Sequence, residues 1–361
     1  MTPIRIRVRS AQGPYAVLVG AGLSRRLPDL LDRHHLPSPG VIVSVAPVWR
    51  RHGSRLRGLA AARSPVLIPD GERAKTLATT ARLYDACAAR GLDRRSLLLA
   101  FGGGVTGDVA GFAAASYLRG LRLVQVPTTL LAQVDSAVGG KVGVNLPRGK
   151  NLVGAFHPAA LVVCDPELLR TLPAREFRAG LYEVVKYGVI ASAPLFRRIE
   201  TRLPDILARR TTVLTDLVAR CCRIKARVVM ADEHESGLRR VLNFGHTIGH
   251  ALEAMTGYRR FRHGEAVAWG MLAAAHVSAA RGRLPAAATD RLSALIRRIG
   301  PLPRVGDLRA HDALDVVGRD KKVVDGRLHF VLATRIGATA IAADVSRAEL
   351  TGALRAIGLR A

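Results

Sequence analysis

Short apolar runs alternate with helical segments in the first half of the chain. The runs end at glycine, proline or charged residues, as the strands of a buried sheet do. We predict strands over residues 4–10, 15–20, 40–45, 64–69, 96–104 and 121–129. Helical periodicity over residues 75–90 and 105–118 falls between those runs. This alternation predicts an α/β domain with a largely parallel sheet.

From about Pro173 the strand pattern fades and helical periodicity dominates. We predict helices over residues 176–191, 205–230, 239–256, 264–282, 287–299 and 347–357. We predict that residues 327–334 and 338–341 form a β-hairpin near the C-terminal end of the chain, the late hairpin. The chain therefore divides into an N-terminal α/β domain, residues 1–170, and a C-terminal, mainly α-helical domain, residues 171–361.

Composition places the chain among globular proteins. It has 361 residues, of which 49% are apolar and 23% charged, enough for two domains with a sizeable core. Its weakly polar stretches fall short of the ~20 residues that a membrane span needs, so we expect no membrane association. The first ten residues alternate apolar and charged side chains and lack a secretory apolar core, so we expect a cytoplasmic location. The four cysteines have neither disulfide nor metal-site spacing.

The formal charge of +27 raises the possibility of nucleic-acid binding, because basic surfaces attract phosphate backbones. However, the arginines are spread along the whole chain, and 4% aromatic residues leave little surface on which bases could stack. We therefore expect no nucleic-acid partner. The charge is better suited to steering a small, multiply anionic substrate.

Lysine is rare among the 55 basic residues of the chain. Only seven are lysines: Lys75, Lys141, Lys150, Lys186, Lys225, Lys321 and Lys322. Most lie in or beside clusters rich in glycine, acid or histidine. An ammonium is a compact point charge that a planar guanidinium cannot replace, so the lysines indicate where a functional site lies.

A glycine-rich turn follows the apolar run that ends at Phe101. Gly102, Gly103 and Gly104 lead into a small-residue helix. Such a turn lets backbone N–H groups approach a pyrophosphate at the helix N-terminus. The turn lacks the G-x-G-x-x-G pattern, so a merely tight turn is the alternative. Three further polar loops, 127–129, 135–141 and 149–151, favour an anion site.

Histidines cluster in the second domain. His246 and His250 are four residues apart and therefore share one helix face, and His263 follows after a short loop. Glu183 precedes Lys186 by three residues on another helix. One carboxylate and two or three imidazoles suit Zn²⁺ with an open coordination position. Spacing alone favours His246 and His250 together as ligands.

Taken together, these motifs resemble the 3-dehydroquinate synthase family, from the segment 70–75 to the segment 320–322. The resemblance implies a Rossmann-like NAD-binding domain joined to a helical metal-binding domain, usually in a homodimer. It implies that Glu183, His246 and His263 bind zinc or cobalt. It also implies that His250 faces the phosphate end of the substrate, contrary to the spacing argument.

The remaining family contacts are carried over position by position. Those that would contact NAD are Asp70, Gly71, Glu72, Arg73, Ala74, Lys75, Gly104, Val105, Thr106, Gly107, Asp108, Thr128, Thr129, Asp135, Lys141, Lys150, Leu168, Leu169, Arg170 and Thr171. Those that would contact substrate are Asp135, Lys141, Asn151, Lys186, Lys225, Arg239, Asn243, His250 and Lys322, with Arg119 contributed by the partner subunit.

The reaction that the resemblance implies converts 3-deoxy-D-arabino-heptulosonate 7-phosphate, a small anionic sugar phosphate, to 3-dehydroquinate and phosphate. It comprises transient oxidation by NAD, phosphate elimination, re-reduction and intramolecular aldol closure. The chain departs from the family at Val45, where an acidic or amide residue often accepts a ribose hydroxyl, so weaker NAD binding is expected.

Three other enzyme classes share parts of this pattern. They are a 2-deoxy-scyllo-inosose or valiolone synthase, an amino-dehydroquinate synthase, and a metal-dependent polyol dehydrogenase. Lys225, Arg239 and Asn243 favour dehydroquinate synthase over the first class. The second is nearly indistinguishable by sequence, and the third does not need the set of lysines.

Overall fold

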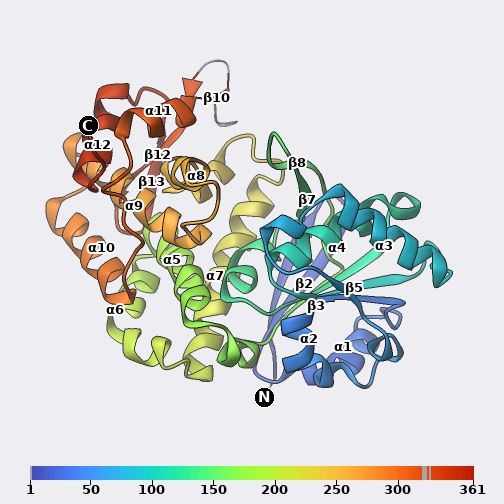
Figure 1. The fold of residues 1–361 in the computed structure, drawn as a ribbon. Coiled ribbons are helices and arrows are strands. Elements are labelled where there is room, and N and C mark those ends of the chain that lie inside the picture. Colours follow the sequence, from blue (N-terminus) through green and yellow to red (C-terminus); the bar gives the residue numbers. More distant parts are fainter. Residues whose placement is uncertain (1, 319–322, 325–326) are drawn as a thin grey trace. The chain divides into compact units, whose positions relative to one another are not determined.

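The computed structural model describes residues 2–318, 323–324 and 327–361. The chain forms two compact units (Figure 1). The first contains the residues up to Pro173 and the segment Arg209–His234, and the second contains Ala174–Ala208 and Glu235–Ala361. Residues 209–234 therefore belong to the first unit, whereas the sequence prediction assigned them to the second domain.

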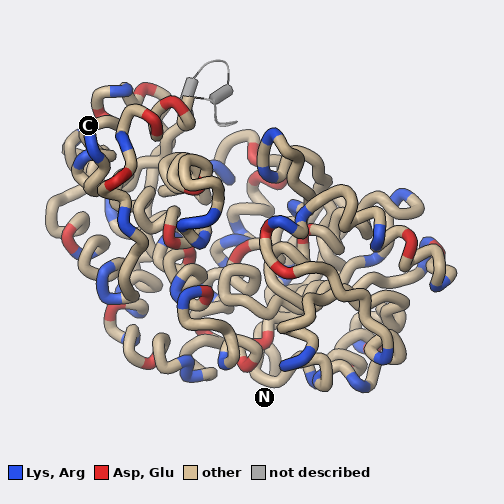
Figure 2. Tube along the Cα trace, viewed as in Figure 1, with Lys and Arg blue, Asp and Glu red and all other residues tan. Residues whose placement is uncertain are grey.

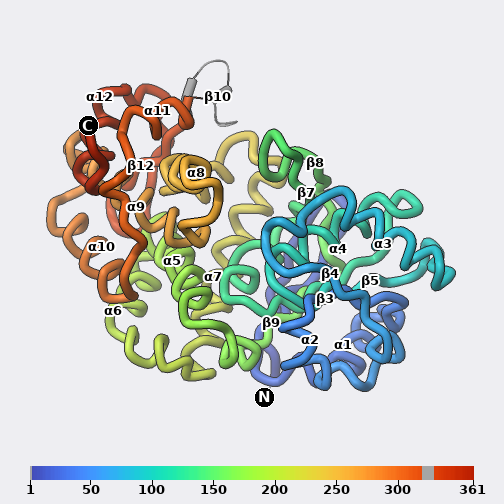
Figure 3. Tube along the Cα trace, in the orientation of Figure 1, coloured from blue at the N-terminus to red at the C-terminus, as the bar shows by residue number. Residues whose placement is uncertain are grey.

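A seven-stranded sheet forms the centre of the first unit. Its strands are β1 (Ile4–Ser10), β2 (Gly13–Val19), β3 (Val41–Val45), β4 (Val66–Ile68), β5 (Leu97–Gly102), β6 (Arg122–Pro127) and β9 (Leu161–Cys164). The order is β1-β2-β9-β6-β5-β3-β4, and only β1 and β2 pair antiparallel. Figure 3 labels the two short strands β4 and β9. The predicted α/β class with a largely parallel sheet is confirmed.

The sheet is buried because its central strands are apolar on both faces. Every residue of β3 and β5 is buried, whereas β1 alternates between exposed and buried positions. The core on one side gathers Leu27, Leu31, Leu99 and Phe101. Trp49 packs edge-on against Phe101, with ring centroids 6.3 Å apart.

Helices and a separate hairpin complete the first unit. The helices are α1 (Leu27–Arg33), α2 (Ala46–His52), α3 (Leu77–Ala89), α4 (Gly104–Ser116) and α7 (Thr211–Ala231), with the short turns η1 (Leu23–Arg26), η2 (Gly53–Leu56), η3 (Ala60–Arg63), η4 (Glu72–Ala74), η5 (Tyr117–Arg119), η6 (Ala132–Ser136) and η7 (Pro166–Thr171). The hairpin consists of β7 (Lys141–Leu146) and β8 (Gly149–Phe156). The sequence predicts loops over parts of this hairpin, because glycines interrupt its apolar pattern.

The second unit is mainly helical, as predicted. Its elements are α5 (Ala174–Ala191), α6 (Ala193–Leu207), η8 (Leu238–Asn243), α8 (His246–Met255), α9 (His263–Ala280), α10 (Ala286–Ile299), α11 (Ala310–Gly318), β10 (Val323–Val324), β11 (Arg327–Leu328), β12 (Phe330–Arg335), β13 (Ala338–Ala342) and α12 (Arg347–Ala356). The pairing of β12 with β13 is the predicted late hairpin, with slightly shifted bounds.

Glycines set the close packing of α5, α8 and α9. A Cβ atom at Gly270 of α9 would lie 1.8 Å from the carbonyl oxygen of Gly245, just before α8. A Cβ at Gly264 would lie 1.9 Å from the carbonyl oxygen of Ala179 in α5. Only residues without a side chain permit these approaches. Gly270 thereby allows the start of α8 to lie against α9, and Gly264 allows the first turn of α9 to lie against α5.

Candidate active site

The glycine turn lies where parallel-sheet proteins bind nucleotides. Strands β3 and β5 are neighbours, but β3 leads outward to β4 and β5 leads the other way to β6. Ligands bind beside the carboxyl ends of strands at such a reversal of strand order. Gly102 ends β5 and Gly104 begins α4, so the N-terminus of a 13-residue helix faces this position.

The turn leaves little room for side chains. A Cβ at Gly102 would lie 2.3 Å from Thr106 Oγ1, and one at Gly104 would lie 3.1 Å from Ser136 Oγ. The hydroxyl of Thr128, which follows β6, is buried and has no hydrogen-bond partner among the described residues. Bare backbone at a helix N-terminus and an unsatisfied buried hydroxyl fit a bound pyrophosphate group.

Lys75 organises a polar cluster beside this turn. Its buried ammonium contacts the Asp108 carboxylate on α4 and the Asn151 amide on β8. Burial raises the pKa of Asp108, and the Lys75 charge opposes that rise. The structure therefore brings together two predicted NAD residues, Lys75 and Asp108, and one predicted substrate residue, Asn151.

Asn145 ties the 70–75 segment to the hairpin. Its backbone N–H donates to the Lys75 carbonyl at 2.8 Å, and its side-chain amide donates to Glu72 Oε1 at 2.8 Å. Its own Oδ1 accepts from the Asn151 backbone N–H at 2.8 Å. Lys150 Nζ lies 4.0 Å from Glu72 Oε1. The local sequence around Asn145 contains nothing that predicts this bridging role.

Lys225 lies in the first unit although it follows the predicted boundary. It projects from α7, and its Nζ donates to two oxygens of Asp135. The distances are 2.6 Å to the backbone carbonyl and 2.5 Å to the side-chain Oδ1. The Lys225 side chain is 7% exposed. Asp135 belongs to the π-helical turn η6, so a buried ion pair fixes one predicted substrate lysine to the turn after β6.

Other predicted residues of the first unit have more varied surroundings. Lys141 begins β7 and is exposed. Thr129 Oγ1 accepts from the Ala132 backbone N–H at 3.1 Å. Leu168 is part of the apolar core, whereas the Thr171 hydroxyl lies 2.7 Å from His52 Nε2. Val45, at the end of β3, is 4% exposed and brings only an apolar side chain to the carboxyl edge.

Arg119 lies in a strained loop. It is exposed in η5 and has a φ of 66°, after Leu118 with a φ of 49°. Left-handed backbone at two successive residues other than glycine is costly. The arginine is therefore held in a position that an unconstrained loop would not favour.

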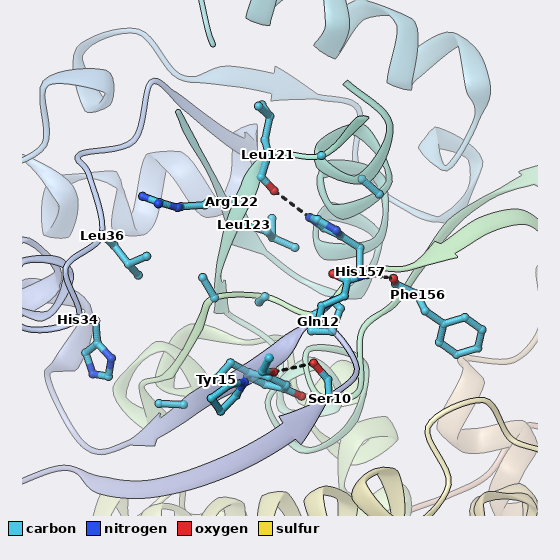
Figure 4. A pocket seen from close by; sticks show the side chains of 18 of the residues that line it. Ser10, Gln12, Tyr15, His34, Leu36, Leu121, Arg122, Leu123, Phe156 and His157 are labelled. Atoms are coloured by element: carbon cyan, nitrogen blue, oxygen red, sulfur yellow. Dashed lines mark hydrogen bonds between the residues drawn. The ribbon is translucent and has the colours of Figure 1, made fainter. Parts of the chain in front are cut away.

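A separate cavity of about 980 Å³ lies in the first unit. Figure 4 shows Tyr15 from β2, Arg122 and Leu123 from β6, and His157, whose Nε2 lies 2.9 Å from the Leu121 carbonyl. Arg119 is the only described residue of the predicted site in its lining. The cavity is thus distinct from the glycine turn.

The three residues predicted to bind a metal, Glu183, His246 and His263, are brought together within the second unit. Glu183 is fully buried on α5. Its Oε1 lies 3.6 Å from His246 Nε2 and 3.8 Å from His263 Nε2. One ligand atom from each of the three residues lies within 4.8 Å of the other two. Because α5, α8 and α9 pack so closely, residues far apart in sequence form one donor set.

The surroundings of Glu183 fit a bound cation. Lys186 Nζ pairs with Oε2 at 2.5 Å, whereas Oε1 has no hydrogen-bond partner among the described residues. A buried carboxylate oxygen without a hydrogen bond is costly. A metal ion between the carboxylate and the two imidazoles would satisfy it, and three protein ligands leave zinc a position for substrate.

The imidazoles are oriented by different acceptors. His246 Nδ1 lies 3.2 Å from the Phe244 backbone carbonyl, and His263 Nδ1 lies 3.2 Å from Glu253 Oε2. Burial lowers the pKa of His263, but the Glu253 and Glu183 carboxylates outweigh that effect, so its pKa is raised. Glu253 was missed in the sequence, although it lies three residues after His250 on the same helix.

His250 lies beside this set rather than in it. Its ring centroid is 5.5 Å from that of His246 and 5.8 Å from that of His263. A second group that could hold a metal contains His250, Glu253 and His263. Neither group combines His246 with His250, the pair that spacing alone favours.

The remaining substrate candidates of the second unit are largely buried. Lys186 is 1% exposed, and its Nζ lies 5.3 Å from the centre of the Tyr187 ring. Arg239 is buried in η8. Asn243 ends the same turn and donates to Glu235 Oε1 at 2.7 Å. Lys322 lies outside the described residues.

The basic residues that give the chain its positive charge are not gathered in one region. Figure 2 shows Lys and Arg distributed along both units. In the described part of the chain no helix is long and apolar enough to cross a membrane. Three of the predicted site lysines, Lys75, Lys186 and Lys225, are instead distinguished by their burial.

Two family models cover most of the chain. One described as 3-dehydroquinate synthase N-terminal matches residues 65–179, and one described as 3-dehydroquinate synthase C-terminal matches residues 180–323. The 3-dehydroquinate synthase of Symbiobacterium thermophilum is 47% identical over 357 residues, which cover 95% of this chain and 98% of that relative.

Solved structures of related cyclases share the fold. The 2-epi-5-epi-valiolone synthase of Streptomyces hygroscopicus subsp. jinggangensis, with NAD⁺ and Zn²⁺ bound, is 30% identical with a TM-score of 0.86, covering 95% of this chain and 96% of that one. A 2-deoxy-scyllo-inosose synthase complexed with carbaglucose-6-phosphate, NAD⁺ and Co²⁺ is 26% identical with a TM-score of 0.86, covering 98% and 100%.

Proposed function

Because the chain belongs to the 3-dehydroquinate synthase family, we propose that it converts 3-deoxy-D-arabino-heptulosonate 7-phosphate to 3-dehydroquinate and phosphate. It is an enzyme with NAD and a divalent metal as cofactors. The observation that carries the proposal is the buried Glu183 with two imidazole nitrogens facing its Oε1, in a chain that matches both family models.

We assign NAD to the carboxyl edge of the sheet in the first unit. When bound, it accepts a hydride from a substrate hydroxyl carbon and returns it later in the same turnover. The bare turn from Gly102 to Gly104 and the N-terminus of α4 would hold its pyrophosphate. The Thr128 hydroxyl, which has no partner among the described residues, supplies a further donor. Lys75 keeps Asp108 in place beside them.

Glu183, His246 and His263 would hold the metal, which when bound polarises substrate oxygens as a Lewis acid. The helices α5, α8 and α9 position these side chains before any ligand arrives. His250 lies beside the three without joining their donor set. We assign it to the phosphate end of the substrate, where a neutral or protonated imidazole can donate a hydrogen bond.

The cationic side chains of this chain would bind the two anionic ends of the substrate. Lys225 is a point charge fixed by Asp135, and Arg239 offers a planar fork suited to a carboxylate. We assign Lys141, Lys186, Asn151, Asn243 and Lys322 to the same substrate. Holding both ends at fixed positions orients the open chain for ring closure, which removes much of the entropic barrier.

The related cyclases are the second candidate. This chain is 47% identical to a curated 3-dehydroquinate synthase and 30% and 26% identical to the two sibling cyclases. That difference favours the dehydroquinate reaction. An amino-dehydroquinate synthase would share the same site residues. Only the choice of substrate would distinguish it from a 3-dehydroquinate synthase.

The decisive experiment combines the purified protein with heptulosonate phosphate, Zn²⁺ and a catalytic amount of NAD⁺. We expect release of one phosphate per substrate and a product with the mass of dehydroquinate, without build-up of NADH absorbance. Stoichiometric NADH would instead indicate a dehydrogenase. Chelation should abolish turnover and added Zn²⁺ or Co²⁺ should restore it, whereas full activity in metal-free protein would contradict the metal assignment.

We also propose that the enzyme is a cytoplasmic homodimer in which Arg119 of one subunit completes the site of the other. The exposed, strained position of Arg119 supports this role. Arg119→Ala and Lys225→Arg proteins should each lose at least about tenfold in activity, yet mixing them should restore part of that activity through hybrid dimers. No recovery in hybrids whose formation is verified by tag pull-down would refute the shared site. Fractionation of source cells tests the location.

A further inference from the structure

Glu253 is a buried carboxylate that the reaction does not yet explain. It lies on α8 and is 3% exposed. Its Oε2 lies 3.2 Å from His263 Nδ1. A carboxylate removed from water is costly unless a partner satisfies it, so its position beside an imidazole calls for a reason.

The two nitrogens of His263 point to different carboxylates. Nδ1 lies beside Glu253, and Nε2 lies 3.8 Å from Glu183 Oε1. In a neutral imidazole only one nitrogen carries a proton. If Nδ1 donates its proton to Glu253, the lone pair of Nε2 is directed at the position between His263 and Glu183. That is the tautomer a metal ligand requires.

We propose that Glu253 is a positioning residue that fixes the tautomer and orientation of His263 and strengthens it as a metal ligand. The inference rests on the proposed metal-binding function. A charged acceptor behind a ligating imidazole increases the basicity of that imidazole. His246 differs, because a neutral backbone carbonyl at Phe244 occupies the corresponding place. The two imidazoles are therefore unequal ligands.

The packing of α8 on α9 places Glu253 where the interaction needs it. His263 is the first residue of α9. Gly249, one turn before Glu253, would place a Cβ 3.1 Å from the backbone of Ala266. The next turn of α8 therefore runs beside the start of α9. The Tyr258 N–H donates to the Glu253 carbonyl at 2.8 Å and closes the end of the helix.

The competing explanation is that Glu253 itself binds a metal, together with His250 and His263. The two explanations differ in the role of His250. If Glu253 acts through His263, then His250 is dispensable for metal binding. If Glu253 is a ligand, removal of His250 should weaken metal binding as much as removal of Glu253.

The test measures Zn²⁺ affinity by chelator competition in the absence of NAD and substrate. We expect about tenfold weaker binding for Glu253→Gln, whose amide oxygen can still accept the Nδ1 proton, and up to about a hundredfold weaker binding for Glu253→Ala. His250→Ala should change the affinity by less than threefold. The Co²⁺ absorption spectrum should shift in both Glu253 variants, because the donor strength of His263 changes.

Glu265→Gln is the matched control. Glu265 is a buried carboxylate two residues after His263, but it accepts from Arg175 and from the Arg262 backbone, and glutamine also serves at this capping position. Its Zn²⁺ affinity should equal that of the wild type. Unchanged affinity in folded Glu253→Gln and Glu253→Ala proteins would overturn the proposal, and an equal loss in His250→Ala would replace it with the second metal group. Wild-type turnover tests the proposed function separately.

Discussion

At Lys225, the size and geometry of the cationic group matter as well as its charge. Its ammonium lies 2.6 Å from the Asp135 carbonyl in a nearly closed environment. Arginine would keep the charge, but its larger planar head cannot occupy the same point. Because a misplacement of about 1 Å can cost on the order of a hundredfold in rate, we expect Lys225→Arg to lose at least about tenfold in kcat.

Steady-state kinetics together with circular dichroism test this expectation. Arg227→Lys, an exposed position on the same helix α7, is the control and should retain wild-type kcat. Lys141→Arg should behave like Lys225→Arg. Near wild-type turnover in both arginine variants would mean that the scarcity of lysine reflects composition rather than chemistry.

Val45 sets a second prediction at the residue scale. It ends β3 beside the glycine turn and brings no polar group to the carboxyl edge. An acidic residue at this position of a nucleotide-binding sheet accepts a ribose hydroxyl. We therefore expect Val45→Asp to lower the Kd for NAD⁺ several-fold in a calorimetric titration, with Zn²⁺ affinity unchanged. A Kd equal to that of the wild type would refute the role of this position.

At the scale of elements, the glycines between α8 and α9 decide whether the proposed metal site forms. A Cβ at Gly270 would lie 1.8 Å from a backbone oxygen, which no change of rotamer can relieve. We expect Gly270→Ala to destabilise the protein by about 3 kcal/mol or more and to abolish Zn²⁺ binding. Gly352 in α12 has open space around it, so Gly352→Ala should stabilise by about 0.5–1 kcal/mol. Denaturant unfolding of both variants measures the contrast.

Element-scale features also limit what sequence could predict. The buried strands β3 and β5 and the long helices follow from apolar periodicity, and the His and Glu residues of the metal group are visible as motifs. The β7–β8 hairpin was missed because glycines at 143, 149 and 154 interrupt its pattern. These glycines let the two strands approach closely, since a Cβ at Gly143 would lie 2.5 Å from the Val153 carbonyl.

The grouping of histidines around Glu183 could not come from local spacing either. His246 and His250 share a helix face, yet the set around Glu183 takes its second imidazole from the start of α9. Helix periodicity describes neighbours within one element and carries no information on how α5, α8 and α9 pack. The resemblance to a family supplied the third residue, and the tertiary contact with Glu253 was visible only in the structure.

At the scale of the molecule, two histidines whose pKa is lowered in the folded state, His52 and His157, make stability depend on pH. Burial lowers the pKa of His52 and of His157, and Arg55 lowers that of His52 further. The unfolded chain therefore binds protons at a higher pH than the folded chain does. The contribution of these two histidines to the free energy of unfolding is therefore fully present above about pH 6.5. It decreases as the pH falls below that value.

Thermal unfolding at pH 7.5 and pH 5.5 measures this dependence. We expect a lower Tm at pH 5.5 in the wild type and a smaller drop in His157→Gln, whose amide can still donate to the Leu121 carbonyl. An equal drop in both proteins would exclude His157 as a source of the pH dependence.

The first unit is built from two separate segments of the chain, and this determines when it can fold during translation. The chain leaves this unit after Pro173, builds α5 and α6, and returns with α7 before leaving again. A ribosome has therefore begun the second unit before the first can close, because α7 carries Lys225 and also Cys222, whose thiol lies 3.2 Å from the Gln133 carbonyl. A nascent chain ending near residue 208 exposes the apolar surface that α7 covers. Arrested chains of that length should be digested by protease, whereas chains with residue 234 clear of the ribosome should resist it.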